Sequence, residues 1–133
     1  MTFSEKFLYE REAIAAALRA AHIPSIQFNK DAIPAQLPCA ILVLDSETGR
    51  LATSRRFADS DLTWTVFLIV NAQNVSDPDA ELYALKEAFR AAYLASMSRD
   101  LPQVTYYTSR LDGARLVRIA RIDLLRSGSG AAS

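Results

Sequence analysis

The residues that could do chemistry in this sequence are few, and its one cysteine and one histidine come first. Cys39 lies in the apolar run PCAILVL, and His22 precedes the turn signal IPS. A nucleophilic thiol needs a neighbouring base such as histidine to ionise it at neutral pH. The apolar surroundings instead favour Cys39 as a small buried side chain. A single cysteine also excludes an internal disulfide and a cysteine zinc cluster.

Carboxylates offer one further candidate cluster, formed by Asp45, Glu47, Asp59 and Asp61. These residues lie on predicted turns, where acidic side chains are common for conformational reasons. The sequence contains no glycine-rich phosphate loop, no HExxH and no nucleophile elbow. We therefore expect no catalytic residue, no cofactor site and no metal site, and we interpret the chain as a protein that is not an enzyme.

The charges balance, with 15 basic and 15 acidic residues in 133. This balance argues against a free-standing DNA-binding domain, which usually shows a basic excess. Most of the basic residues are arginine, which suits ion pairs at protein interfaces. Tyr106, Tyr107, Arg110 and Arg118 could form a platform for single-stranded nucleic acid. The zero net charge favours the alternative that they are ordinary residues of a sheet with one solvent-exposed face.

The elements that must position these residues begin with a predicted helix. Thr2 and Glu5 have the spacing of a capping box, and the helix should end near Ala21. Its apolar residues fall on one face, and its charged residues, Glu10 among them, fall mostly on others. The segment 23–38 carries three prolines. We expect it to be extended, to hold little regular structure and to cover exposed strand faces.

A meander of three strands is predicted next, at 39–45, 50–57 and 62–70, with a turn at DSETG between the first two. In the third strand one face carries Trp64, Val66, Leu68 and Val70. The other face starts polar and becomes apolar at Phe67 and Ile69, whereas a strand with one wet face should alternate cleanly. This second face therefore needs a cover, either the 23–38 segment or a neighbouring subunit.

The second half of the chain predicts a well-marked helix and a hairpin. Asp77 is a natural N-cap before Pro78, and the predicted core stripe of the helix is Leu82, Leu85, Phe89 and Ala92. Two strands, 103–110 and 114–125, flank Asp112-Gly113, a strong hairpin signal.

A two-residue turn at this hairpin would place Tyr106 opposite Ile119 and Tyr107 opposite Arg118. It would also place Arg110 opposite Arg115, which is unfavourable, and a longer loop or a bulge would relieve that clash.

Together these elements predict an α+β domain over residues 1–126 and a flexible tail over 127–133. The sheet is antiparallel or mixed with about five strands, two helices pack on one of its faces, and the order is α-β-β-β-α-β-β. No signal peptide or membrane-spanning run is evident, so we expect the protein to be made and kept in a cytoplasm.

Three stretches in this order resemble a known family. LPCAILVLDSET, then DLTWTVFLIVNAQ, then SDPDAELYAL look like the tail terminator proteins of long-tailed bacteriophages, the minor tail protein U type. The resemblance covers roughly residues 5–125 and rests on order, length and local patterns. No catalytic signature contributes to it.

The resemblance implies a structural virion protein that assembles as a hexameric ring on the tail tube. The ring ends tail polymerisation and provides the surface for head–tail joining. Its partners would be further copies of itself, the tail tube protein and a head-completion or connector protein. Genomic DNA would pass through the lumen without sequence recognition. Assembly would occur in the host cytoplasm, and the mature location would be the head-proximal end of the tail in the virion, without a membrane.

The resemblance also suggests interface residues. Arg50, Arg55, Arg56 and Phe57 lie on the predicted hairpin that would project towards the tube. Arg115, Arg118 and Arg121, with Arg126, make the last strand basic and could face a lumen, a partner or a neighbouring subunit. We favour protein contacts, because a strongly basic lumen would hold DNA tightly and hinder its passage.

Two alternatives stay open. One is a head-completion or neck connector protein of the same assembly. The other is a small ligand-binding or enzymatic α+β domain, which would require a pocket lined by convergent polar groups.

Overall fold

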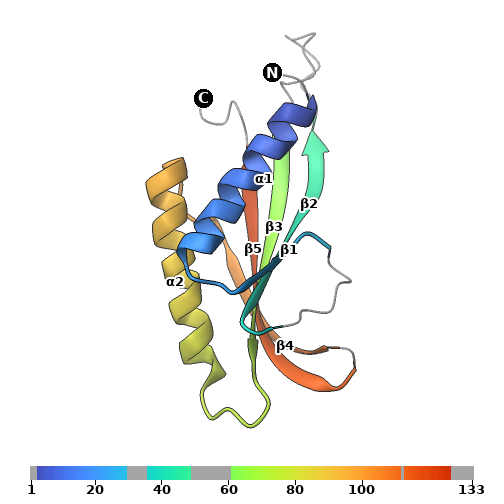
Figure 1. The fold of residues 1–133 in the computed structure, drawn as a ribbon, viewed down its shortest axis with the longest axis vertical. Helices are drawn as coiled ribbons and strands as arrows, with labels where there is room; N and C mark the ends of the chain where they lie inside the picture. Colours follow the sequence, from blue (N-terminus) through green and yellow to red (C-terminus); the bar gives the residue numbers. More distant parts are fainter. Residues whose placement is uncertain (1–2, 30–35, 49–60, 112, 127–133) are drawn as a thin grey trace.

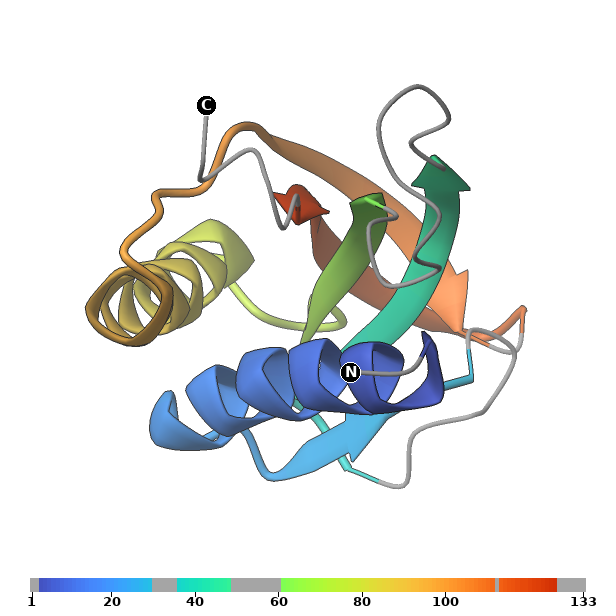
Figure 2. The ribbon, with the colours of Figure 1, turned by 90° about the horizontal axis from the view of Figure 1, so that it is seen from above.

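The fold is a two-layer α+β domain, seen in a computed structural model that describes residues 3–29, 36–48, 61–111 and 113–126 (Figure 1). The elements are α1 (Phe3–Ala20), β1 (Ser25–Gln27), β2 (Cys39–Thr48), β3 (Asp61–Asn71), α2 (Pro78–Met97), β4 (Val104–Leu111) and β5 (Arg115–Arg126). The five strands form one mixed sheet in the order β1-β2-β3-β5-β4. Both helices lie on the same side of the curved sheet (Figure 2). The predicted fold class and element order are confirmed.

The 23–38 segment contains one strand of three residues and otherwise little regular structure among its described residues, as expected. Ser25–Gln27 pairs in parallel with Cys39–Ile41 at the edge of the sheet. Ile26 packs against the main core between the sheet and the helices. Leu37, at the end of the segment, packs against the opposite face and supplies part of the expected cover there.

The predicted turn at DSETG is wrong, because β2 continues to Thr48. The register shifts between Leu44 and Ser46, after which Glu47 pairs with Leu62. The bulge absorbs one residue and lets pairing resume, so the acidic residues lie in a strand rather than a turn. The strand predicted at 50–57 lies outside the described residues.

The N-terminal cap of α2 is as the sequence predicts. The Asp77 side chain accepts a hydrogen bond from the Ala80 backbone N–H at 3.2 Å, and Pro78 begins the helix. Ser98 closes the helix in the left-handed conformation, with φ of 56°. Within the predicted core stripe, Leu82 and Phe89 are buried and the other two members, Leu85 and Ala92, are partly buried.

The main core lies between the helices and the sheet. Trp64, Val66, Leu68 and Val70 of β3 are all fully buried there, as predicted. The Trp64 ring packs against Phe7 of α1 with centroids 5.3 Å apart.

No helix among the described residues is long and apolar enough to cross a membrane.

The second face of the sheet is largely covered within the single chain. A separate apolar cluster there contains Cys39, Ile41, Ile69, Val117 and Ile119, all buried. Leu37, Val43, Phe67, Tyr107 and Leu111 pack against it and are half-buried. The excess of apolar strand surface therefore does not by itself require a neighbouring subunit.

The β4–β5 hairpin has a register one residue away from the predicted one. Leu111 pairs with Arg115, so three residues separate the strands instead of two. As a result Tyr106 lies opposite Ala120, Tyr107 opposite Ile119 and Arg110 opposite Leu116. Gly113 adopts φ of 70°, a conformation that glycine tolerates without steric cost. The longer loop removes the unfavourable Arg110–Arg115 pair.

Candidate interaction surfaces

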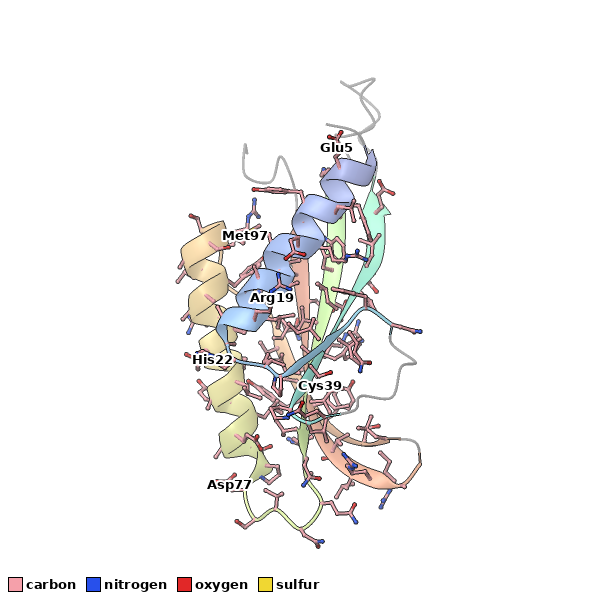
Figure 3. All side chains as sticks on the ribbon, viewed as in Figure 1. Glu5, Arg19, His22, Cys39, Asp77 and Met97 are labelled. Atoms are coloured by element: carbon pink, nitrogen blue, oxygen red, sulfur yellow. The ribbon has the colours of Figure 1, made fainter. Side chains whose placement is uncertain are left out.

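Cys39 and His22 do not form a catalytic pair. Figure 3 shows His22 just after the end of α1 and Cys39 at the start of β2. Cys39 is completely buried in the second apolar cluster. Burial raises the pKa of its thiol to about 11, so the thiol stays protonated at neutral pH.

Only two of the four side chains in the candidate carboxylate cluster belong to the described part of the chain. Asp45 and Glu47 are exposed at the end of β2, whereas Asp59 and the side chain of Asp61 lie outside the described residues. In the part of the chain that the structure describes, no three histidine, cysteine or acidic side chains are grouped so that they could hold a metal ion.

The three arginines proposed on the last strand do not share one surface. Arg118 lies on the helix side of the sheet, where its Nε donates to Asp79 Oδ1 at 2.7 Å and its Nη1 donates to Thr108 Oγ1 at 3.1 Å. Asp79 belongs to the first turn of α2. Arg118 therefore connects β5 to α2 within the chain.

Arg121 lies on the opposite side, because side chains alternate along β5. Its Nε donates to Asp123 Oδ1 at 3.2 Å, and the same oxygen accepts a hydrogen bond from the buried Thr65 hydroxyl at 3.2 Å. The Arg121 side chain remains about half exposed, at 46%. This arginine is the basic group at the centre of the second sheet face.

Arg115 lies on the same side as Arg121, at the hairpin end of β5. With Asn71, Gln73 and Ala114 it lines a shallow, open pocket of about 390 Å³. Gln73 Oε1 accepts a hydrogen bond from the Leu116 backbone N–H at 3.1 Å, which fixes one wall. The other proposed interface residues, Arg50, Arg55, Arg56 and Phe57, lie outside the described residues.

Paired residues form rows across the second sheet face that change from apolar to polar. One row is Cys39–Ile69–Ile119–Tyr107, the next is Ile41–Phe67–Arg121–Thr105, and the third is Val43–Thr65–Asp123. The middle row contains the half-buried Phe67 beside two exposed residues. We call the group Val43, Phe67, Thr105, Tyr107 and Arg121 the sheet patch.

The outward side of α1 carries a surface that the sequence reasoning missed. Leu8 and Tyr9 are 51% and 61% exposed. With Glu5, Glu12, Ala13 and Ala16 they line a shallow, mostly apolar groove of about 550 Å³, and we call these six residues the α1 stripe. The available signal was the spacing 5, 9, 12, 16, which places these residues along one side of a helix, away from the buried Ile14 and Leu18.

One charged residue predicted to lie away from the core is buried. Glu10 is only 3% exposed, and its Oε1 accepts a hydrogen bond from Trp64 Nε1 at 3.1 Å. A buried indole N–H requires an acceptor, and α1 supplies it here. Glu10 therefore has a structural role in fixing the helix against β3.

Two other ionisable groups are held in their charged forms. Burial alone would lower the pKa of Lys86, but its hydrogen bond with Glu87 and nearby negative groups raise the pKa overall. Asp100 receives two hydrogen bonds from Arg90, at 2.6 and 2.7 Å, and this pairing lowers its pKa to about 2. Neither group is suited to proton transfer at neutral pH.

Comparison with known proteins adds no family assignment. No protein-family model matches the chain, and no similar sequence is found among curated proteins.

Proposed function

We propose that this protein is a tail terminator of a long-tailed bacteriophage, a structural virion protein without catalytic activity. The order of elements supports the proposal most strongly. The three stretches that carry the resemblance fall, in order, on β2, on β3 and on the start of α2. The pairing of β2 with β3 joins two of the stretches that carry the resemblance.

The proposed role is to close the tail tube as a hexameric ring and to provide the surface for head–tail joining. In this role the protein contacts further copies of itself, the tail tube protein and a head-completion or connector protein. Genomic DNA passes through the lumen without sequence recognition. Assembly takes place in the host cytoplasm, and the ring remains at the head-proximal end of the tail.

Two features of the described surface are consistent with a role in protein contacts. The α1 stripe presents the large apolar side chains of Leu8 and Tyr9 to solvent beside a mostly apolar groove. The sheet patch combines half-buried aromatic side chains with arginine, a composition common at interfaces.

Negative-stain imaging with tail tubes tests the proposal. The purified protein is mixed with tubes polymerised from the co-encoded tail tube protein. We expect additional ring-shaped density at one tube end and six-fold symmetry in end-on views. The Trp64→Ala variant, which should lose its fold, serves as the control and should leave tube ends bare.

The proposal would be contradicted by native protein that leaves all tube ends bare or coats tube walls along their length. Binding to an isolated head connector in the absence of tubes would instead favour a head-completion role.

A further inference from the structure

The α1 stripe and the sheet patch lie on opposite sides of the domain. α1 packs on one face of the sheet (Figure 2), and the residues of the sheet patch belong to the other face. A contact between two copies that joins different patches is heterologous, and it propagates from subunit to subunit until it closes a ring or forms a filament. Two different patches on opposite sides of one chain meet this geometric requirement.

The two patches also differ in charge and match in apolar character. The α1 stripe has Glu5 and Glu12 at the border of an apolar groove. The sheet patch has exposed Arg121 beside half-buried Phe67 and Tyr107. An acidic border facing the exposed guanidinium of Arg121 favours this docking and disfavours contact between two α1 stripes.

The ion pairs of Glu12 and Arg121 do not prevent such a contact. Glu12 pairs with Arg19, and both side chains are more than half exposed. Arg121 pairs with Asp123, and these side chains are nearly half exposed. Exposed ion pairs contribute little to stability, so they can rearrange when a second copy docks.

We propose that the α1 stripe of one subunit binds the sheet patch of the next subunit in a head-to-tail contact. This inference rests on the proposed ring and names the two surfaces that would join its subunits. The residues 127–133, SGSGAAS, carry no side chain large enough to fill the groove in place of a second copy. The apolar side chains of the stripe gain a partner, and Arg121 supplies the opposite charge.

Cross-linking between two singly substituted chains tests the contact. One chain carries Ala16→Cys in the α1 stripe, and the other carries Thr105→Cys in the sheet patch, where both positions are exposed. The native Cys39 is fully buried and should not react, so the unsubstituted protein measures the background. A short bis-maleimide traps even transient contacts, so the test does not need a stable oligomer in solution.

We expect the mixed dimer to exceed the two same-chain dimers together severalfold. Adding Glu5→Lys and Glu12→Lys to the Ala16→Cys chain should lower the mixed dimer severalfold. In the matched control, a chain with Leu94→Cys on α2 replaces the Ala16→Cys chain. Leu94 is exposed to a similar degree as Leu8 of the α1 stripe. Mixed with the Thr105→Cys chain, this control should give only the background level of cross-linked dimer.

A statistical mixture of the three dimers, an excess of the Ala16→Cys dimer with itself, or no product above background would each overturn the inference. If the native protein caps tubes while the cross-linking is statistical, only these surfaces are wrong. If the mixed dimer accumulates while tube ends stay bare, the contact exists and the tail terminator proposal is wrong.

Discussion

At the scale of single residues, burial decides the roles of the groups that looked chemically capable. Cys39 is enclosed by apolar side chains, and Glu10 is committed to the Trp64 indole. Arg118 is engaged by Asp79 and Thr108. Each of these groups therefore contributes to folding.

Cys39 should be unreactive in the native protein. Its pKa rises from 9.0 to about 11 because burial disfavours the thiolate. A disulfide reagent at pH 8 should label the chain only after denaturation. Labelling of native protein at the rate of an exposed thiol would contradict the buried position.

The same shift predicts a pH dependence of stability. The folded state keeps the thiol protonated, so its contribution is complete below about pH 9 and is lost as the pH rises towards 11. The free energy of unfolding of the native protein should therefore fall relative to that of Cys39→Val over this range. If the free energies of unfolding of the two proteins change in parallel with pH, the thiol has the same pKa in the folded and unfolded states, and the prediction is wrong.

Trp64 should be a core residue and not a partner contact. Trp64→Ala should cost roughly 3–5 kcal/mol and yield poorly folded protein, because it empties the space between β3 and α1. Trp64→Phe keeps a ring beside Phe7 but removes the donor to Glu10, and it should cost about 1–3 kcal/mol. Denaturant unfolding measures both values. A stable Trp64→Ala protein that fails only in assembly would place this position at an interface.

At the scale of elements, local signals specify the helices more directly than they specify strand pairing. Asp77 and Pro78 determine the start of α2 through one hydrogen bond and one fixed backbone angle. Asp77→Ala should therefore destabilise the protein by about 1 kcal/mol. Asp77→Ser retains an acceptor and should restore most of the loss. Equal melting temperatures for all three proteins would mean that the cap contributes nothing.

The parts of the fold that the sequence did not predict depend on contacts between distant segments. Ser25–Gln27 has little strand pattern of its own and becomes a strand because the backbone of β2 is available beside it. The bulge near Asp45 likewise follows from pairing across the sheet, whereas the longer hairpin loop was one of the two alternatives that the arginine clash suggested. Strand preference depends strongly on such context.

The candidate surfaces were predicted less well than the fold for a related reason. Helical periodicity assigned the buried side of α1, but Leu8 and Tyr9 on the other side gave no periodic signal strong enough to stand out from the charges around them. Glu10 was placed away from the core because a charged residue is normally solvated, whereas its partner, Trp64, is 54 positions away.

At the scale of the whole molecule, Arg55 and Arg56 should carry contact with the tube. Changing both to Glu would introduce repulsion if the tube end is acidic, and charge mismatches slow encounter and weaken binding. The fold should survive, because both arginines lie in a predicted polar hairpin, and substitutions away from a core usually change stability by about 0.5 kcal/mol or less. Thermal melting of the variant and tail lengths in complemented lysates measure the two effects.

Overlong or headless tails with a normal melt are the expected result for this variant. Normal tails and a normal phage yield would show that the arginine pair does not contact the tube. The tube-facing surface would then have to be sought on the last strand, starting with Arg115 at the hairpin end of β5.

The most direct test of the account is the growth of tail tubes in the presence of the protein. Tube polymerisation is started with the co-encoded tail tube protein, the native chain is added, and the length distribution is measured by electron microscopy over time. We predict that elongation stops on addition and that the arrested tubes carry a six-fold ring at one end. Tubes that continue to lengthen at the rate seen without the protein would contradict its role as a tail terminator.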